Sequence, residues 1–406
     1  MPSALPAGDP LPVDGSLPES ALAALAGQSF GVYLHVPFCS TRCGYCDFNT
    51  YTAAELGDQP GASRAGYIDS AIAELDLAAR ALGAGVPPVS TIFVGGGTPT
   101  LLPPAELGRF VRAVGDRFRL AADAEITTES NPESVDAFAL AQLAEQGFNR
   151  ISFGMQSAVP HVLAVLDRMH SAGRPQRAVQ EARAAGFPHI SLDLIYGTPG
   201  ESLGDWRSSL EAAISANPDH LSAYALIVEN GTRLASRIRR GELPSPDDDD
   251  LADKYLLAEE RLSGAGFRWY EVSNWAQSTA ARCRHNLAYW RSGNWWGVGP
   301  GAHSHVGGMR WWNVKHPATY GDRLAAGVSP AHAGEHVSLR EQHTERVLLE
   351  LRLAEGLDIA LLSIAEQTRL PDLGARGLIE CVADRAILTL KGRLLADAVV
   401  RDLLDD

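Results

Sequence analysis

The chain reads Tyr33-Leu-His-Val-Pro-Phe-Cys39-Ser-Thr-Arg-Cys43-Gly-Tyr-Cys46 directly after an apolar run of β-strand type, Phe30–His35. Its three cysteines are spaced C-x3-C-x2-C. Because they follow a strand, we expect them at the C-terminal edge of a sheet, where parallel α/β folds place their sites. Thiolates are soft ligands, which select zinc, copper or iron–sulfur clusters.

The number of local cysteines favours a cluster over zinc. A structural zinc site needs four ligands, and cysteine-only sites usually contain two CxxC pairs. A cubane held by three thiolates instead leaves one iron open to a small molecule. The spacing therefore predicts a [4Fe–4S] cluster on Cys39, Cys43 and Cys46. Two alternatives stay open, which are a zinc site completed by His35 or a distant residue, and unliganded cysteines.

Strand-like and helical patterns alternate through the first 235 residues. The strand-like runs are Phe30–His35, Thr91–Val94, Glu125–Glu129, Arg150–Phe153, His189–Leu194 and His220–Tyr224. Helical spacing of apolar residues lies between them, as in Ile68, Ile72, Leu75, Ala79 and Leu82. This alternation predicts an α/β fold with parallel strands and right-handed crossovers. A partial (β/α)6 barrel is the natural closure, and a doubly wound sheet is the alternative.

Composition changes suggest four regions. Residues 1–28 are rich in Pro, Ala and Gly and are predicted to be a flexible tail. The barrel is expected over 29–235, and a connecting region rich in Trp, Gly, Asn and His over 236–335. Residues 336–406 predict a small α+β domain of winged-helix type. The acidic run Asp247–Asp250 is interpreted as a solvated loop that caps the helix Leu251–Gly264.

The net charge and the cysteine content indicate which partners and which cellular compartment to expect. The chain has 406 residues and a formal net charge of −14, which argues against a protein that binds nucleic acid through phosphates. Its five cysteines form no disulfide framework, so we expect a reducing cytoplasm. The first 15 residues have neither a basic region nor an apolar core, so we do not expect them to form a signal peptide. The uncharged stretches are interrupted by Pro and Gly, so we expect no spanning helix. Peripheral membrane contact stays open.

Further polar groups follow the later strands. The segment Phe93-Val-Gly-Gly-Gly97-Thr98-Pro-Thr100 offers glycines that let a ligand approach the backbone. Glu129 ends the third predicted strand, Gln156 follows the fourth, and Asp193 lies in the fifth. Polar residues placed repeatedly at strand ends are easier to explain by a ligand than by packing.

These segments resemble the radical SAM superfamily, in which C-x3-C-x2-C carries an aromatic such as Tyr45 before the third cysteine. The series YLHVPFC, GGGTPT, TESNPES, GFNRISFGMQS, DLIYGTPGES and HLSAYAL is similar to the oxygen-independent coproporphyrinogen III oxidases and their relatives. The resemblance implies S-adenosylmethionine (SAM) as cofactor and an electron donor such as flavodoxin or ferredoxin. It places SAM at Tyr33, Tyr45, Gly96 and Glu129. It places Gly97, Thr98, Gln156, Arg168 and Asp193 in the neighbouring pocket, where the oxidases hold a second SAM.

One departure indicates the branch. The oxidases continue with a fourth cysteine two residues after the third, but here Cys46 is followed by Asp47-Phe48-Asn49. This continuation resembles the haem chaperone branch (HemW), as does His285-Asn-Leu-Ala-Tyr289-Trp. The resemblance implies haem as a ligand, with His285 and Tyr289 as candidate haem residues. The segment Gly299-Pro-Gly-Ala-His303-Ser304 also has a family counterpart, which lies near SAM, and its His303 is a second candidate for a haem ligand or a SAM contact. Imidazole is a common axial ligand of haem iron, although buried packing is the plainer role for His285.

The sequence therefore predicts a haem chaperone on a radical SAM scaffold, which binds a [4Fe–4S] cluster, SAM and haem and delivers haem to haem proteins. The first alternative is the oxidative decarboxylation of coproporphyrinogen III in porphyrin biosynthesis. It is disfavoured by the missing fourth cysteine and by an N-terminal segment unlike that of the oxidases. The second alternative is a structural zinc protein.

Overall fold

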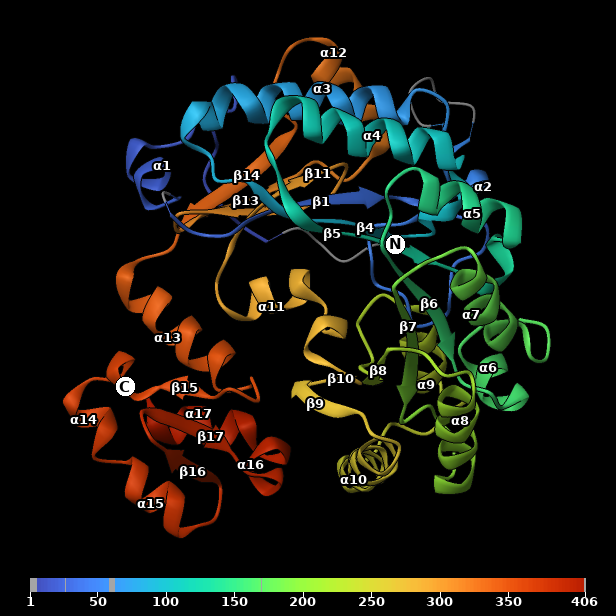
Figure 1. Ribbon diagram of the computed structural model, residues 1–406, viewed down its shortest axis with the longest axis vertical. Helices are drawn as coiled ribbons and strands as arrows, with labels where there is room; N and C mark the ends of the chain where they lie inside the picture. Colours follow the sequence, from blue (N-terminus) through green and yellow to red (C-terminus); the bar gives the residue numbers. More distant parts are fainter. Residues whose placement is uncertain (1–5, 26, 58–62, 169, 405–406) are drawn as a thin grey trace.

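The computed structural model describes residues 6–25, 27–57, 63–168 and 170–404 (Figure 1). The strands are β1 Phe30–Val36, β2 Phe38–Cys39, β3 Tyr51–Thr52, β4 Val89–Gly96, β5 Leu120–Ser130, β6 Arg150–Gln156, β7 His189–Tyr196, β8 His220–Ala225, β9 Arg268–Glu271, β10 Asn274–Ala276, β11 Asn294–Val298, β12 His303–Val306, β13 Met309–Asn313, β14 Ala331–His336, β15 Leu357–Asp358, β16 Ile379–Val382 and β17 Arg385–Leu388. The helices are α1 Glu19–Leu25, α2 Ala53–Leu56, α3 Tyr67–Leu82, α4 Pro104–Arg117, α5 Ala137–Glu145, α6 Pro160–Val165, α7 Arg174–Ala184, α8 Leu203–Ser215, α9 Arg233–Arg239, α10 Asp248–Gly264, α11 Arg284–Trp290, α12 Pro317–Ala325, α13 Leu339–Glu350, α14 Ile364–Gln367, α15 Leu370–Ala375, α16 Leu390–Leu394 and α17 Ala396–Leu403.

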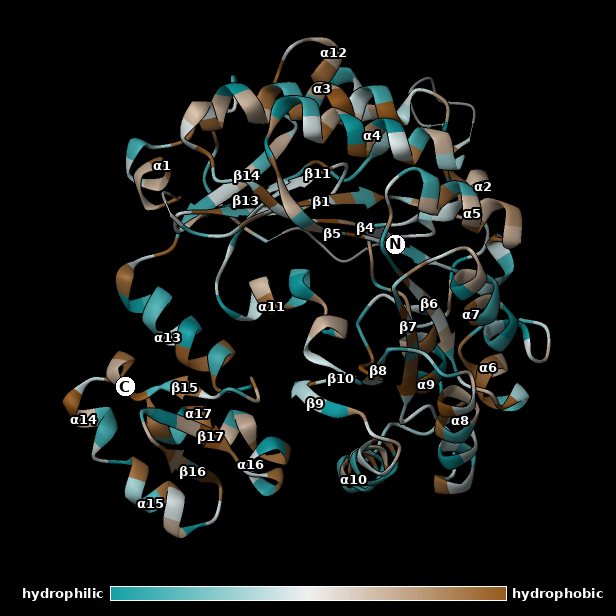
Figure 2. Cartoon of the chain, viewed as in Figure 1, coloured by the Kyte–Doolittle hydropathy of each residue, from teal (hydrophilic) through white to brown (hydrophobic). Residues whose placement is uncertain are grey.

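Six parallel strands form the centre of the molecule. They are neighbours in the order β1-β4-β5-β6-β7-β8, which is also their order along the chain. A doubly wound sheet would reverse its strand order at a switch point, and this sheet does not. The predicted partial (β/α)6 barrel is therefore confirmed. Apolar residues colour the central strands, while α3 and α4 alternate between hydrophilic and hydrophobic residues along their length (Figure 2).

The sheet is larger than the sequence pattern predicts. Strand β11 pairs parallel to β1, and the antiparallel strands β12, β13 and β14 continue beyond it. At the opposite edge, β10 and β9 add two antiparallel strands to β8. Most of these strands come from residues 265–315, which show no clear sequence period. Strands β10 and β11 are short and buried on both faces, so they lack the apolar–polar alternation that identifies a half-buried strand.

Residues 6–25 differ from the predicted flexible tail. The Asp9 N–H donates to the Gly334 carbonyl at 2.8 Å, and the Gly334 N–H returns a bond to Asp9 at 2.9 Å. Helix α1 contacts β12 and buries Ala21 and Leu25. The unpaired backbone groups of edge strand β14 explain this docking, because they can pair with any extended segment. Residues 1–5 and 26, which belong to the same prediction, lie outside the described residues.

The C-terminal residues form a second small core. Helices α13 to α17 surround the antiparallel sheet β15-β17-β16, in the lower left of Figure 1. This unit docks through Arg393, whose guanidinium lies 4.2 Å from the centre of the Trp269 ring and 3.1 Å from the Glu259 carboxylate. Glu355 adds ion pairs to arginines at both ends of α11. The C-terminal unit therefore holds α11 from one side.

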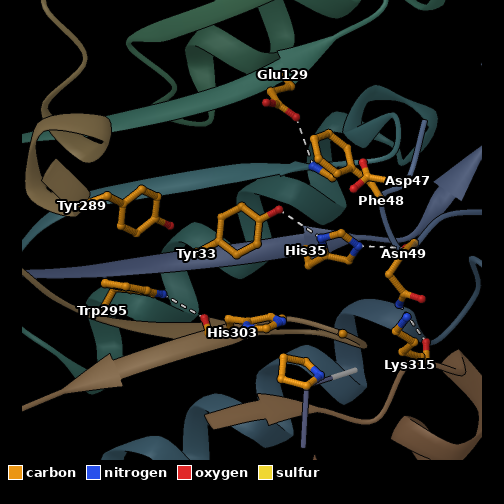
Figure 3. Close-up of a pocket in the computed structure, with 14 residues that line it drawn as sticks. Tyr33, His35, Asp47, Phe48, Asn49, Glu129, Tyr289, Trp295, His303 and Lys315 are labelled. Atoms are coloured by element: carbon orange, nitrogen blue, oxygen red, sulfur yellow. Dashed lines mark hydrogen bonds between the residues drawn. The ribbon is translucent and has the colours of Figure 1, made fainter. Parts of the chain in front are cut away.

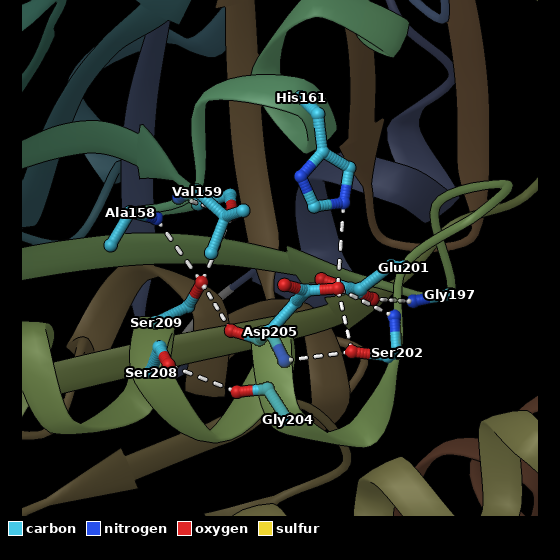
Figure 4. A network of polar contacts seen from close by, with 11 residues as sticks. Ala158, Val159, His161, Gly197, Glu201, Ser202, Gly204, Asp205, Ser208 and Ser209 are labelled. Atoms are coloured by element: carbon cyan, nitrogen blue, oxygen red, sulfur yellow. Dashed lines mark hydrogen bonds and ion pairs between the residues drawn. The ribbon is translucent and has the colours of Figure 1, made fainter.

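Helix starts are fixed by acidic and hydroxyl side chains. The Asp247 carboxylate accepts from the Asp250 N–H at 3.0 Å, so the acidic run caps α10 and forms its first turn. This confirms that the run caps the helix, which begins three residues before the predicted Leu251. At α8, Ser202 and Asp205 form a capping box, and Ser209 ties the helix to the Ala158 N–H after β6 (Figure 4). These contacts hold the helices against the strand ends that carry the site.

None of the described helices is long and apolar enough to cross a membrane.

Candidate functional site

The cysteine loop leaves β1 at the carboxyl end of the parallel strands. Cys39 lies in β2, which pairs with β3 through Phe38 and Tyr51. The loop between them carries Cys43 and Cys46 and is held by a bond from the Gly44 N–H to the Leu166 carbonyl at 3.1 Å. The Gly44 carbonyl of the same loop accepts from the Leu234 N–H at 2.8 Å. The loop is therefore held by the segments that follow β6 and β8 as well as by its own strands, β2 and β3.

The glycine loop after β4 lies against the cysteine loop. The Gly97 N–H donates to the Val36 carbonyl, and the Thr98 N–H donates to the Phe38 carbonyl, both at 2.7 Å. A Cβ atom on Gly97 would lie 2.5 Å from the Phe38 oxygen, so no larger residue permits this approach. Gly96 has a φ of 108°, a backbone conformation that favours glycine. The two glycines let the loops carrying the predicted cluster and SAM residues lie in contact.

The donor chemistry at the cysteines suits a cluster. Burial raises the pKa of the Cys39 thiol, and it raises the pKa of Cys46 to about 11. The charge of each thiolate would act on its neighbours, and the Arg168 guanidinium lies 3.6 Å from the Cys43 sulfur. Among the described residues, no three His, Cys, Asp or Glu side chains are grouped closely enough to hold a single metal ion. The three thiols are soft donors of the kind that iron–sulfur clusters use, and Arg168 places a cation beside one of them.

A cavity of about 550 Å³ opens beside this loop (Figure 3). Its size lies in the usual range for small-molecule and cofactor sites. Residues from several distant parts of the chain surround it. The lining residues are Pro6, Tyr33, His35, Asp47, Phe48, Asn49, Gly96, Glu129, Tyr289, Trp295, Gly301, Ala302, His303 and Lys315.

The floor of the cavity is a hydrogen-bonded chain along β1. The Tyr33 hydroxyl lies 3.0 Å from Nδ1 of His35, and Nε2 of His35 lies 2.9 Å from the Asn49 carbonyl (Figure 3). Burial lowers the pKa of His35 to about 4, so its ring is neutral at physiological pH. The Asn49 amide donates to the Pro300 and Lys315 carbonyls, each at 2.9 Å. Asn49 thereby joins the end of the cysteine loop to the opposite wall.

Two carboxylates lie inside the barrel near the cavity. The Gly96 N–H donates to the Glu129 carboxylate at 3.0 Å, and the Ser152 hydroxyl donates to Asp193 at 2.8 Å. Burial, followed by the charge of Asp193, raises the pKa of Glu129 to about 8. Burial also raises the pKa of Asp193. A carboxylate held at this pKa would ionise when a cationic group binds beside it.

The helix α11 is anchored by a buried carboxylate that the sequence did not indicate. Glu125 accepts from the Arg284 and His285 N–H groups, each at 3.0 Å. The His285 ring is buried, with Nδ1 2.7 Å from the Thr91 hydroxyl and Nε2 2.8 Å from the Tyr289 hydroxyl. Both ring nitrogens therefore have partners within the protein. The ring also stacks on Phe93 at 5.1 Å between centroids.

The predicted site residues divide into two groups. Tyr33, Gly96, Glu129, Tyr289 and His303 line the cavity. The other predicted residues lie outside its lining: Cys39, Cys43, Cys46, Tyr45, Gly97, Thr98, Gln156, Arg168, Asp193 and His285. Of these, Gln156 ends β6 with a φ of 63°, and Tyr45 packs against Leu166 beside the cysteine loop.

Sequence reasoning missed several lining residues. His35 was considered only as a zinc ligand, and Asp47 to Asn49 only as a mark of the subfamily. Trp295 and Lys315 were not identified, because no local period links them to the cysteines. Part of this wall was predicted, because the segment Gly299-Pro-Gly-Ala-His303 supplied His303 as a candidate site residue.

The wall that carries His303 is fixed by a second buried carboxylate, Glu74 on α3. Glu74 accepts from the Gly299 N–H and the Asn313 amide, each at 2.8 Å, and from the Tyr320 hydroxyl at 2.5 Å. Burial raises the pKa of Glu74 to about 7. The carboxylate thus holds both ends of the β12–β13 hairpin against α3.

We expect this pKa to make stability depend on pH. The unfolded chain releases the Glu74 proton near the ordinary value of 4.5, whereas the folded chain holds it up to about 7. The contribution of Glu74 to the free energy of unfolding should therefore fall by about 3 kcal/mol as the pH rises through this window. Urea unfolding of the wild type and of Glu74→Gln between pH 4.5 and 8 measures the difference. Parallel curves for the two proteins would contradict the assignment, and Glu106→Gln on the surface is the control.

The comparisons with known proteins agree on one superfamily. Residues 33–213 match the family model described as "Radical SAM superfamily". The chain is 55% identical over 383 residues to "Heme chaperone HemW" of Mycobacterium tuberculosis, which covers 94% of this chain and 97% of the relative. It is 33% identical over 378 residues to the protein of the same name in Bacillus subtilis, which covers 90% of this chain and 97% of the relative.

A solved structure matches over most of the fold. The structure titled "Coproporphyrinogen III oxidase (HemN) from Escherichia coli is a Radical SAM enzyme" superposes with a TM-score of 0.80. It covers 96% of this chain and 94% of that one at 24% sequence identity. At this identity the match establishes the shared fold, including the partial barrel.

Proposed function

We propose that this chain, which belongs to the haem chaperone HemW family within the radical SAM superfamily, binds haem and delivers it to haem proteins. The observation that carries the proposal is the 55% identity along 97% of a HemW relative. The replacement of the oxidases' fourth cysteine by the Asp47-Phe48-Asn49 continuation favours the same function. In the structure these three residues form one wall of the cavity, so the segment that marks the branch also lines the site.

The cluster and SAM are part of the same proposal. Cys39, Cys43 and Cys46 would hold a [4Fe–4S] cluster, with the Arg168 guanidinium balancing thiolate charge at Cys43. When bound, the reduced cluster and SAM supply the one-electron chemistry that gives the superfamily its name. Residues assigned to SAM are Tyr33, Tyr45, Gly96 and Glu129, with Gly97, Thr98, Gln156, Arg168 and Asp193 beside them.

The carboxylate of Glu129 has a defined task in this arrangement. It faces the cavity and already accepts from the Gly96 N–H. Its raised pKa keeps the carboxyl protonated near neutral pH before SAM binds. The cationic amino group of SAM would favour the ionised form, so binding would release that proton. Glu129 would therefore orient the amino group rather than take part in bond cleavage.

Partners follow from the chemistry of haem and of the cluster. Reduction of a cluster needs an electron donor, for which flavodoxin or ferredoxin is the expected class. Unpaired thiols at the cysteine loop suit a reducing cytoplasm, where we place the protein. Haem acceptors in a respiratory chain would bring it into peripheral contact with a membrane.

Oxidation of coproporphyrinogen III remains the second candidate, because the fold is shared with an oxidase and because Gln156, Arg168 and Asp193 retain the residue types of the oxidases' second SAM site. The missing fourth cysteine argues against it. A colourless protein with stoichiometric zinc after anaerobic purification would instead favour the structural zinc alternative.

The test combines haem binding with the absence of porphyrin chemistry. We expect the purified chain to bind hemin with a shifted Soret band and to transfer it to apomyoglobin. Under anaerobic reducing conditions with SAM, we expect no decarboxylation of coproporphyrinogen III. Efficient formation of vinyl groups on the tetrapyrrole would overturn the proposal, as would failure of the wild type to bind hemin. Complementation of a strain that lacks the oxidase gives an independent readout, because a haem carrier should not restore growth.

A further inference from the structure

Among the histidines at or near the cavity, His285 and His303 are in very different states. His285, from the family motif, is 2% exposed and its ring nitrogens lie at 2.7 and 2.8 Å from Thr91 and Tyr289. It does not line the cavity. An iron atom could reach this ring only after one of the two hydrogen bonds breaks and Tyr289 moves aside. His285 therefore has the geometry of a positioning residue, which fixes the Tyr289 side chain at the cavity wall.

His303 has the geometry of a metal ligand. It begins β12, is exposed and lines the cavity. Within the described residues its ring nitrogens have no hydrogen-bond partner, and its nearest ring neighbour is Trp312, at 5.8 Å between centroids. Partial desolvation of the ring at the cavity wall, followed by the charges of Lys315 and Arg310, lowers the pKa of its imidazole. A neutral imidazole with free lone pairs is the form that coordinates iron.

The backbone holds His303 firmly. Its carbonyl accepts from the Trp295 indole N–H at 2.8 Å (Figure 3). The hydroxyl of its neighbour Ser304 accepts from the Gly297 N–H at 2.8 Å. The preceding turn is fixed by a bond from the Gly301 N–H to the Val314 carbonyl at 2.9 Å. The ligand side chain therefore projects from a rigid hairpin, which limits the loss of conformational entropy when it binds.

The walls around His303 suit a flat, apolar macrocycle with anionic substituents. Trp295 and Tyr289 lie in edge-to-face contact at 4.5 Å between centroids, and Phe48 at the mouth is 59% exposed. An aromatic side chain exposed at a cavity mouth is well placed to pack on a porphyrin. Lys315 also lines the cavity, and its ammonium group forms no ion pair within 4.0 Å among the described residues, although the charge of Asp47 acts on it. The cation is thus available to a carboxylate.

We infer that His303 binds the iron of haem and that Lys315 pairs with one of its propionates, an inference that rests on the proposed haem-binding function. The nitrogen lone pair of His303 forms a coordinate bond to iron and displaces a weakly held water or halide. No electron is transferred, and no bond within the protein breaks. SAM would contact the Glu129 side of the cavity, with the Tyr33 ring between Glu129 and His303 (Figure 3).

The experiment titrates hemin into the full-length wild type and four variants, and repeats each titration with iron-free protoporphyrin IX. His303→Gly should weaken hemin binding at least about tenfold and alter the Soret band. Loss of a residue that supports a metal ligand already costs about tenfold or more in affinity, and loss of the ligand itself should cost at least as much. Protoporphyrin IX should bind His303→Gly as it binds the wild type, since it has no iron to coordinate. Added imidazole should restore the hemin spectrum of His303→Gly. His332→Ala, an exposed histidine of β14, is the matched control.

The remaining two variants test the rest of the site. Lys315→Gln should weaken hemin about tenfold but leave the dimethyl ester of hemin unaffected, because the ester carries no propionate charge. His285→Ala should keep the spectrum of the wild-type complex, since the axial ligand is unchanged. Unaltered hemin binding and spectrum in His303→Gly, or loss of axial ligation in His285→Ala alone, would overturn the inference and leave the proposed function intact. Absence of hemin binding by the wild type would instead refute the proposed function.

Discussion

Replacing Cys43 with alanine should abolish the iron–sulfur cluster and leave hemin binding intact. The cysteine loop supplies three thiols, and a cubane that loses one of them keeps only two protein ligands. The Arg168 guanidinium, which lies 3.6 Å from the Cys43 sulfur, would also lose its partner at the loop. After anaerobic reconstitution we expect iron and sulfide to fall from about four per chain to near zero. Absorbance in the region of roughly 400 nm, where clusters absorb, should fall with them.

The control for this prediction is Cys381→Ala. Cys381 is exposed on β16 of the C-terminal unit, so its removal should leave the cluster content unchanged. Retention of a full cluster by Cys43→Ala would refute the assignment of the ligands. Loss of hemin binding together with the cluster would show that the two depend on one another, and it would move the haem iron from His303 towards the cysteine loop.

The fold was predictable where its signals were local. The parallel strands can be recognised in the sequence as short apolar runs separated by amphipathic helices. Each of these strands pairs with the next one along the chain. The cysteines lie within one loop, so their spacing alone indicates a shared ligand. Glu129 and Gln156 could be placed near that loop because the carboxyl ends of parallel strands lie at one edge of a sheet.

The second wall of the cavity could not be predicted in this way. Strand β11 pairs with β1 although more than 250 residues separate Gly31 from its partner Trp295. Nothing in the local sequence of β11 specifies that neighbour. Lys315 reaches the cavity only because β13 follows β12 back across the sheet. Pro6 lines it because residues 6–25 dock on the open edge of β14, a contact that composition alone could not indicate.

The motif that contains His285 shows what a sequence pattern can establish and what requires the structure. The pattern correctly directs attention to α11, which supplies Tyr289 to the cavity. It does not distinguish a ligand from the residue that positions its neighbour. Only the contacts of the two ring nitrogens make that distinction, and they favour a positioning role for His285.

Replacing Glu125 with alanine should produce the largest loss of stability among the substitutions considered. Its carboxylate accepts from the first two N–H groups of α11 and lies 3.7 Å from the Cys283 sulfur. It also opposes the charge of Arg150, which is 2% exposed and donates to the Ala281 carbonyl at 2.7 Å. Alanine would leave buried donors unpaired and would remove one of the acidic groups that face the buried Arg150 cation. We expect the free energy of unfolding to fall by about 3–5 kcal/mol, measured by urea denaturation.

One further variant separates the effect of the Glu125 charge from that of its hydrogen bonds, and a second variant is a surface control. Glu125→Gln keeps one acceptor for α11 but loses the charge, so it should fall between the wild type and Glu125→Ala. Asp69→Ala breaks an exposed ion pair with Arg109 and should cost less than about 1 kcal/mol. Because Glu125 holds the helix that carries Tyr289, hemin affinity should decline in Glu125→Ala even where the chain is still folded. A loss of stability as small as that of Asp69→Ala would show that α11 is held by the C-terminal unit and by packing rather than by this carboxylate.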